Sequence, residues 1–453
     1  MPLKEADARK VFEAILPDDA LAEIVAASRF EERSRKRDAI RLVRAMVIAA
    51  STGYGGRQAD VMRVYFESGA PRVVRGGFYS WFGPALEKVM KAVSGRALDF
   101  VRQQALDVPG ILGRDVTDWH IVDSTTIRLN DSLKHVFPGA GDYAAAKVHK
   151  RFSVGRGTLF NYSVSPARDH DAPHLTIDES WRGLGLLADL GYASLKLLSD
   201  CQEHGVHFVI RLKENWKPRV LAVGRGDFRK TFLSGSDLDV LFASGAVVLE
   251  GKSVDLDVEL GRGAQTVRCR LVGVPVADGA YRFYLTSLPA ATGPLQVADL
   301  YRVRWEIETD NKLDKSCNHL DAISARTESS VRALIHASLV SSMIACSLVH
   351  LARLDDAPPP ARGAERTTPP LHPQTLARAM GSAALMIASA FDESGAKADL
   401  AWKRIAEHLN HLGTDPNWRR SPSILDQIRG WTISPGRPRT GRVAKTASTQ
   451  HVG

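Results

Sequence analysis

The chain has 453 residues, of which 44% are apolar and 25% are charged; this composition is typical of a soluble globular protein, and the length corresponds to about two to four domains. Its 60 Lys and Arg residues exceed its 51 Asp and Glu residues and leave a net charge of +9, which favours a polyanionic partner over an acidic one. It contains no C-x-x-C pair and no run of 18 apolar residues, so a structural zinc site, a disulfide framework and a membrane span are not expected.

The first 105 residues predict a helical region, and it begins without the apolar core of a signal peptide. Apolar residues recur there at spacings of three and four, the period of an amphipathic helix. The expected helices are Ala20–Ala27, Asp38–Ser51, Arg57–Glu67 and Phe78–Val101.

Two parts of this region are candidates for contact with nucleic acid. The stretch Arg29–Arg44 carries seven basic and three acidic residues, which fits either a solvated helix face or a face that contacts phosphates. The segment Arg72–Phe82 combines Arg72 and Arg75 with Phe78, Tyr79 and Trp81, which fits either core packing or a turn that contacts DNA.

After residue 118 the apolar period changes from that of helices to that of strands. Runs of β-branched residues predict strands at Trp119–Leu129, Lys147–Val154 and Leu159–Ser165. The following segments alternate: a helix at Pro173–Trp181, a strand at Leu186–Asp189, a helix at Ala193–Glu203 and a strand at Val206–Leu212. Three strands followed by this alternation predict an α/β fold, with a mixed sheet whose faces are covered by helices.

Short strands between glycine-rich turns return after residue 212 and predict a β-rich insertion. Its expected strands are Ala246–Leu249, Val254–Leu260, Thr266–Val274 and Tyr281–Leu285. A long helix at Leu295–Cys317 and an almost wholly apolar, buried helix at Ser330–Leu354 follow. Helices resume at Gln374 and continue to about Trp431.

These elements divide the chain into seven segments. We expect a helical DNA-binding region at 1–105, an α/β core in two parts at 106–212 and 296–354, the β-rich insertion at 213–295, a Pro-rich linker at 355–373, a C-terminal helical region at 374–433 and a disordered basic tail at 434–453.

Three carboxylates are candidates for chemistry. Asp123 interrupts an apolar strand, where a buried acid needs a partner or a metal ion, although a strand acid also fits an edge or a turn. Asp189 ends a short strand, and ligands of open α/β sheets bind outside the carboxyl ends of strands, although this acid also fits the N-cap of the next helix. Glu308 lies on the long helix predicted at Leu295–Cys317.

One stripe of that helix combines opposite charges. At about 100° per residue, Glu308 shares the stripe with Tyr301, Arg304 and Lys315, and Lys312 extends it. The stripe fits either an amphipathic polar face or a site that holds a metal ion together with a phosphate. Three carboxylates brought together can hold two Mg²⁺ ions about 3.5–4 Å apart for in-line phosphoryl displacement.

Together these residues resemble the DDE transposases of the four-type insertion-sequence family, which have a ribonuclease-H-like catalytic core. The resemblance runs from roughly Ile121 to Leu320 and includes the FPGAGDYAAAKVH and ARDHDAP segments. The family motifs Y-x2-R-x3-E-x6-K, D-x-G-Y and D-[SG]-T are met by Tyr301, Arg304, Glu308 and Lys315, by Asp189, Gly191 and Tyr192, and by Asp123, Ser124 and Thr125.

The resemblance implies a role for each matched residue. Asp123, Asp189 and Glu308 would form the catalytic triad and bind two Mg²⁺ ions, for which Mn²⁺ can substitute. The residues that would contact the phosphates of the transposon end are Tyr301, Arg304 and Lys315.

Trp305, next to Arg304, is a further candidate for DNA binding. In relatives that cut through a DNA hairpin, a flipped base stacks on an aromatic residue; Trp305 fits either that role or core packing. No Trp lies between Lys217 and Ala298 in the insertion, so a second stacking residue there would have to be Tyr281, Phe283 or Tyr284.

By this resemblance we expect a DNA transposase that binds terminal inverted repeats and catalyses Mg²⁺-dependent cleavage and strand transfer. Its partners would be the double-stranded DNA of the transposon ends and the target, and a second copy of the chain in a synaptic complex. We expect it in the bacterial cytoplasm, associated with the nucleoid and not with a membrane. Two alternatives stay open: a non-catalytic, transposase-derived DNA-binding regulator, and a Mg²⁺-dependent nuclease without strand transfer.

Overall fold

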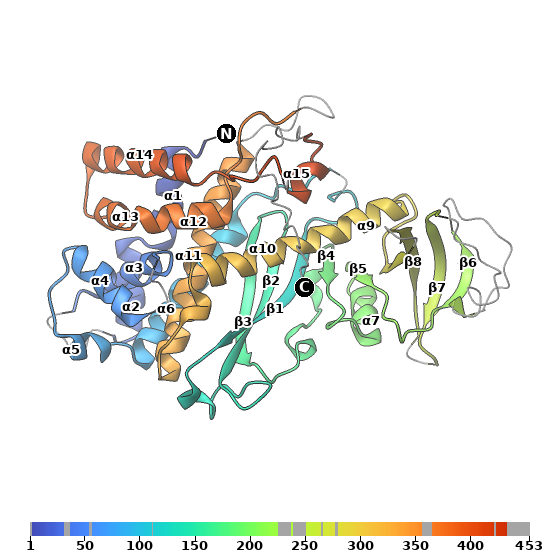
Figure 1. The fold of residues 1–453 in the computed structure, drawn as a ribbon, viewed down its shortest axis with the longest axis horizontal. Coiled ribbons are helices and arrows are strands. Elements are labelled where there is room, and N and C mark those ends of the chain that lie inside the picture. The colour runs from blue at the N-terminus through green and yellow to red at the C-terminus, as the bar shows by residue number, and fades with distance from the viewer. Residues whose placement is uncertain are drawn as a thin grey trace, which may run out of the picture.

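The structure is a computed structural model that describes residues 2–30, 37–53, 57–110, 112–224, 237–238, 251–263, 266–276, 280–355, 365–420 and 423–432. A mixed β-sheet occupies its centre (Figure 1). A helical rod crosses one face of this sheet, and a body of helices built from both ends of the chain lies beside it.

Within the described residues the sheet has nine strands, in the order β3-β2-β1-β4-β5-β9-β8-β7-β6. β1 is antiparallel to β2 and parallel to β4, and β4 is parallel to β5. This is the arrangement of a ribonuclease-H-like core, so the predicted fold class is confirmed. The strands are β1 (Trp119–Arg128), β2 (Ala145–Ser153), β3 (Thr158–Pro166), β4 (Gly185–Ala188), β5 (His207–Arg211), β6 (Arg219–Val223), β7 (Val254–Leu260), β8 (Val267–Pro275) and β9 (Tyr281–Thr286).

The β-rich insertion continues the core sheet. β9 pairs antiparallel with β5, with Ile210 opposite Leu285, and β8, β7 and β6 follow outward. Figure 1 shows these strands at the end of the sheet away from the helical body. The strand expected at Ala246–Leu249 lies outside the described residues.

The helices follow the predicted order with two main departures. They are α1 (Glu5–Ile15), α2 (Asp18–Ala27), α3 (Ala39–Ala50), α4 (Gln58–Glu67), α5 (Arg75–Tyr79), α6 (Pro84–Gln103), α7 (Leu195–Glu203), α9 (Pro294–Arg302), α10 (Glu306–Lys312), α11 (Glu328–Leu354), α12 (Pro373–Ser382), α13 (Ala384–Ala390), α14 (Gly395–Leu412) and α15 (Ile424–Ile428).

The first departure is that the helix expected at Phe78–Val101 is broken. It divides at Gly83–Pro84, where α6 starts with Pro84 as its first residue. Proline lacks the amide hydrogen that a continuing helix needs, and it disfavours helical backbone at the residue before it. The break is therefore local in origin.

The second departure is that no α-helix forms at Pro173–Trp181. Two 3₁₀ turns, Ala172–His174 and Glu179–Trp181, occupy this segment. The Asp178 carboxylate accepts hydrogen bonds from the amide and the hydroxyl of Ser180, at 3.0 and 2.6 Å. Such local side-chain bonds offer the backbone an alternative to the helix.

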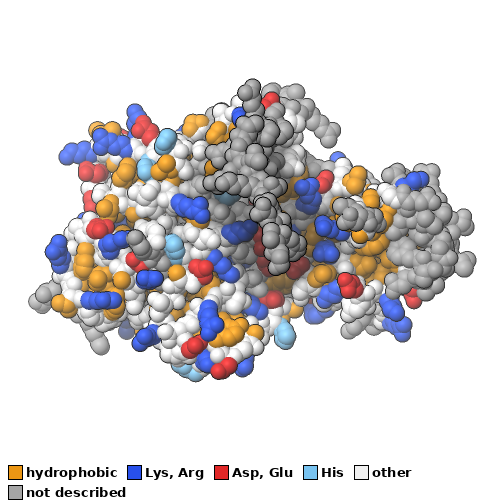
Figure 2. Space-filling view, in the orientation of Figure 1, with side chains coloured by type: hydrophobic (Ala, Val, Ile, Leu, Met, Phe, Trp, Pro, Cys, Tyr) orange, Lys and Arg blue, Asp and Glu red, His pale blue; other side chains and the backbone are white. Residues whose placement is uncertain are grey.

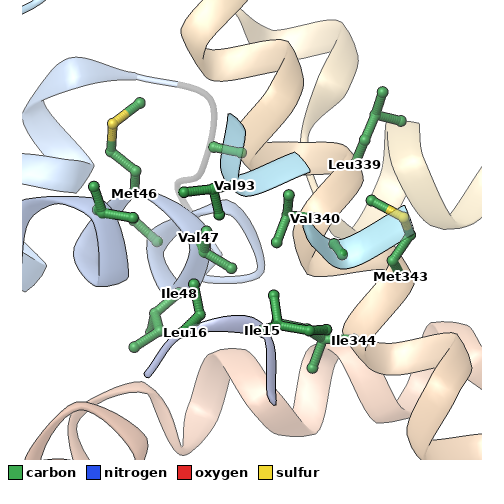
Figure 3. Close-up of a cluster of buried hydrophobic side chains, with 14 of the residues drawn as sticks. Ile15, Leu16, Met46, Val47, Ile48, Val93, Leu339, Val340, Met343 and Ile344 are labelled. Carbon is green, nitrogen blue, oxygen red and sulfur yellow. The ribbon is translucent and has the colours of Figure 1, made fainter. Parts of the chain in front are cut away.

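α11 lies at the centre of the helical body. Its most apolar stretch has a mean hydropathy of 1.7, high enough for a membrane span, but 94% of that stretch is buried inside the protein, as in the core helix of a globular fold. Figure 3 shows how Ile15 of α1, Val47 of α3 and Val93 of α6 meet Val340 and neighbouring residues of α11. Residues of α12 and α14 belong to the same buried cluster, so both helical ends of the chain share one core with α11.

This packing also shows which residues of Arg29–Arg44 and Arg72–Phe82 have structural contacts. Phe78, Trp81 and Phe82 are buried and contact one another, whereas Arg72 and Arg75 are exposed. In the described part of Arg29–Arg44, Arg41 pairs with Asp392, and the buried Arg44 donates to the carbonyl oxygen of Leu16. Phe78 and Trp81 are thus core residues, whereas Tyr79 is half-buried. Arg41 and Arg44 are structural, and residues 31–36 lie outside the described part.

The Glu308 helix, our name for the rod Pro294–Cys317, changes its pitch along its length. α9 passes through a 3₁₀ turn, Val303–Trp305, into α10, and a π turn, Leu313–Cys317, ends the rod. The expectation of one regular α-helix is therefore wrong in detail. Because a π turn rotates each residue by less than an α-helix does, Lys315 does not keep the regular phase relative to Glu308 that the stripe assumed.

We predict that acid weakens the fold through His336 of α11. Its Nδ1 lies 2.5 Å from the Tyr162 hydroxyl of β3, and burial, with smaller effects of Lys91 and Arg332, lowers its pKa from 6.5 to about 4. The folded state then binds fewer protons than the unfolded chain, so the free energy of unfolding should fall between about pH 6.5 and 4, by up to about 3 kcal/mol from this residue.

Urea unfolding followed across this pH window tests the prediction. The H336Q variant should lose part of the pH dependence, whereas H135Q, which removes an exposed histidine, should keep all of it. Equal pH dependence in H336Q and the unchanged protein would contradict the assignment.

Candidate active site

Asp123 and Asp189 stand side by side on neighbouring parallel strands. Val122 of β1 is paired with Ala188 of β4, and each aspartate is the next residue along its strand direction. Adjacent strands lie about 4.8 Å apart, and equivalent positions on them face the same side of the sheet. That side is the one on which the Glu308 helix packs, because Ile121 and Leu187 share a buried cluster with Ile307.

The Glu308 helix brings a third carboxylate to this point. Burial raises the pKa of Asp123, and the negative charges of Glu308 and Asp189 raise it further, while the Ser124 amide and Arg304 act in the opposite direction. Arg304 also lies 3.7 Å from the Glu308 carboxylate. The three predicted acids are therefore close enough to interact, and one cation of the predicted stripe lies among them.

Asn311, one turn after Glu308, ties the helix to the first strand. Its side-chain amide donates to the Asp123 carboxylate at 3.1 Å, and its own carbonyl oxygen is buried without a described partner. Reasoning from sequence overlooked this residue. In the sequence Asn311 is only a polar residue three positions after Glu308, and such residues are common on solvated helix faces. The sequence therefore contains no specific indication of its contact with Asp123.

The donor set suits a hard divalent cation. All three groups are carboxylates, and burial together with the charges of Glu308 and Asp189 raises the pKa of Asp123, so a nearby positive charge would stabilise its charged form. Among the described residues, no three His, Cys, Asp or Glu side chains stand close enough to hold a metal by themselves. Mg²⁺ usually takes only one or two protein carboxylates and completes its shell with water and substrate phosphate, so these residues fit the ion.

A buried ion cluster fixes the Glu308 helix to the sheet. Lys150 of β2 is paired in register with Asp123, and its ammonium contacts the carboxylates of Asp310, at 2.8 Å, and Asp314. Burial alone would lower the pKa of Lys150, but the two acids raise it above its ordinary value. All three side chains are buried, and none was predicted, because the pairing depends on strand register.

The cluster extends to α11. The Ser342 hydroxyl donates to Asp314, and the Asn318 amide donates to Ser342 at 2.6 Å. Burial and the charge of Asp310 raise the pKa of Asp314 to about 6, although Lys150 opposes them. β2, the Glu308 helix and α11 are thus joined through one network of polar groups.

The predicted DNA-contacting residues occupy different environments. Tyr301 is 9% exposed, and its hydroxyl is buried with no described hydrogen-bond partner. Trp305 is 61% exposed, so the core-packing alternative for this residue is wrong. Lys315 is half-buried and forms no ion pair with any described carboxylate.

The other segments named in the resemblance meet on the opposite face of the sheet. Lys147 and His149 of β2 approach the Asp171 carboxylate, at 3.1 and 3.5 Å, and the His149 ring stacks on His174. Because β2 alternates its side chains, this group lies across the sheet from Lys150.

A family model described as the transposase DDE domain matches residues 118–344, half of the chain. The chain belongs to this family of DDE transposases. The matched residues contain β1 to β5, the insertion, the Glu308 helix and the first part of α11. All three carboxylates of the candidate site lie within them.

Curated relatives of this chain are transposases for insertion sequence elements. The transposase for insertion sequence element IS231C of Bacillus thuringiensis subsp. berliner is 22% identical over 284 residues, 51% of this chain and 56% of the relative. That for IS231F of B. thuringiensis subsp. israelensis is 31% identical over 100 residues, 21% of each chain. The putative transposase InsL for IS186A of Escherichia coli (strain K12) is 39% identical over 83 residues, 18% of this chain and 22% of the relative.

The matches to these relatives thus span between about a fifth and just over half of their length. Among solved structures, a cryo-EM structure of the piggyBac transposase synaptic complex with hairpin DNA aligns with 93% of this chain and 91% of that chain, at 12% identity and a TM-score of 0.44. At this score no further conclusion follows from the likeness.

We predict that K150M destabilises the DDE transposase by about 3–5 kcal/mol, because it leaves two buried carboxylates without a cation. Urea unfolding measures the loss. The matched control is K147M, which removes a lysine from the opposite face of the same strand, where Asp171 is half-buried. A loss for K150M no larger than for K147M would contradict the role of the cluster. Replacing Asp310 and Asp314 by Asn in the K150M background should recover part of the stability.

Proposed function

We propose that this chain is an enzyme of DNA transposition that cuts and joins DNA strands by in-line phosphoryl transfer at Asp123, Asp189 and Glu308. The observation that carries the proposal is the meeting of three carboxylates from two adjacent parallel strands and one crossing helix. Membership of the transposase family and the insertion-sequence relatives support the same reaction class.

In this proposal Asp123, Asp189 and Glu308 hold two Mg²⁺ ions, or Mn²⁺ in their place. The ions, when bound, would activate the attacking oxygen and stabilise the leaving oxygen of the phosphodiester. The protein's own contribution is to hold the carboxylates in place: the strand pairing sets the two aspartates, and Asn311 and the Lys150 cluster set the helix that carries Glu308.

Tyr301, Arg304, Trp305 and Lys315 are the proposed DNA contacts near the cleaved strand. The Tyr301 hydroxyl, which has no hydrogen-bond partner among the described residues, can donate to a phosphate oxygen. Arg304 can pass from Glu308 to a phosphate, because its present contact is long. Trp305 exposes an aromatic face on which a base can stack.

We infer that the substrates are the inverted repeats of the transposon ends and a target duplex, bound in the cytoplasm at the bacterial nucleoid. Because two ends must be held together during strand transfer, we infer a homodimer in the synaptic complex. Exposed Arg72 and Arg75, next to the buried aromatic residues of the front section, are our candidates for recognition of the end sequence.

We predict that D123N, D189N and E308Q each abolish Mg²⁺-dependent cleavage while DNA binding is largely kept, because only metal binding is lost. The substrate is a duplex made from the DNA that flanks the reading frame, and the products are separated on a gel. D299N, which changes an exposed acid on the same helical rod, is the control and should cleave normally.

Retained cleavage in any one of the three variants would refute the catalytic assignment. The products also distinguish a transposase from a non-catalytic regulator and from a nuclease without strand transfer. Binding without any nicking by the unchanged protein would favour the regulator, and nicking without joined products would favour the nuclease.

We further predict that R304A and K315A weaken DNA binding and make it less sensitive to salt. Each phosphate contact contributes about 0.9 to the slope of log binding constant against log salt concentration for duplex DNA, so each variant should lose about that much. Fluorescence anisotropy with the flanking-DNA duplex measures the slope. An unchanged slope would contradict the phosphate contact.

In the same assay, R72A and R75A should reduce the preference for the flanking sequence over an unrelated duplex. An unchanged preference would exclude Arg72 and Arg75 as residues that recognise the sequence of the transposon end.

A further inference from the structure

A basic groove of about 820 Å³ lies beside the Glu308 helix. One of its walls comes from the Glu308 helix, with Tyr301, Arg304 and Trp305, and another from β5 and β9. The remaining wall belongs to the end of α11 and to the C-terminal helical region, through Arg353 and Arg378. Figure 2 shows Lys and Arg side chains gathered around the middle of this face of the molecule.

The groove carries an excess of positive charge. Among the described residues that line it, seven are Lys or Arg and three are Asp or Glu, and one of the three acids, Asp310, is already engaged by buried Lys150. Arg353 and Arg378 form no ion pair with any described carboxylate. Arg378 lies beside the Cys317 thiol. Burial raises the pKa of this thiol, so it stays uncharged and does not neutralise the positive charge of Arg378.

The groove also presents groups that suit nucleotides. Trp305 is 61% exposed at the groove, and the Tyr301 ring lies 5.0 Å from that of Tyr284. The buried hydroxyl of Tyr301 has no described partner. A cationic groove that follows the backbone, combined with aromatic faces for the bases, is the arrangement by which proteins bind single-stranded nucleic acid.

The size of the groove suits a short single strand. Its volume lies in the range of small-ligand sites, about 300–1,000 Å³. A short stretch of one strand fits a recess of this volume. Arg304 both lines the groove and contacts Glu308, so the groove begins next to the candidate catalytic carboxylates.

We propose that this groove binds a single-stranded segment of DNA that leads away from the carboxylates, with Arg353 and Arg378 contacting its phosphates. The C-terminal helical region then forms part of the DNA-binding surface, beyond the residues of the Glu308 helix. This inference rests on the proposed function, because it assumes that DNA is the substrate, and it names the strand conformation and the residues that hold it.

The test measures binding of a fluorescent oligothymidylate, which forms no duplex, as a function of salt concentration. Each phosphate contact contributes about 0.7 to the salt slope for single strands, so R353A/R378A should lower the slope by about 1.4. The matched control is K403A/R404A, which removes two exposed charges from α14 outside the groove and should leave the slope unchanged. Thermal unfolding of both variants checks that the fold is kept.

Because Arg353 is half-buried, the exposed single variant R378E provides a second measurement. It should weaken oligothymidylate binding more than R378A and more than the charge reversal R404E. A slope for R353A/R378A equal to that of the control pair, or equal binding by R378E and R404E, would overturn the groove assignment. That result would leave the proposed function standing if D123N still abolished cleavage, whereas cleavage retained by D123N would refute the function whatever the slope.

Discussion

One buried lysine holds the candidate active site together. Lys150 reaches from β2 to two carboxylates of the Glu308 helix, and Ser342 of α11 binds one of them from the other side. Ion pairs therefore join the strand to the Glu308 helix, and a hydrogen bond joins that helix to the helical body, in an interior where unpaired charges are very costly. Because Lys150 stands in register with Asp123, the same contact sets the height at which Glu308 meets the strand acids.

Around this anchor, like charges are held close together instead of being dispersed. Burial, with smaller effects of the charges of Glu308 and Asp189, raises the pKa of Asp123, and this unfavourable position of a carboxylate lies where a cation is expected. The cations of the Glu308 helix and of the groove lie just beyond them. An arrangement with acids at the centre and bases around them suits a metal ion bound to a phosphodiester, since each charge of the substrate complex then faces its opposite.

The helical body gives α11 two functions. Its apolar faces bury α1, α3 and α6 together with α12 and α14, and its last turn carries Arg353 into the groove. The N-terminal and C-terminal helical regions consequently cannot be removed without exposing this helix to water. Residues that recognise DNA in these regions must therefore be examined through surface substitutions, because a truncation would remove part of a shared core.

Most of the elements and the three candidate carboxylates can be predicted from the amino-acid sequence. The period of two predicted Val254–Leu260 with its observed ends, and the spacing of acids and bases identified the residues around Glu308. The helix breaks before Pro84 because proline lacks the amide hydrogen that a continuing helix needs. The spacing of apolar residues alone does not predict this break. The core position of Lys150, the support given by Asn311 and the exposure of Trp305 were decided only by the tertiary structure. The reason is physical: strand register and helix pitch determine which side chains meet, and both follow from packing between segments far apart in the chain.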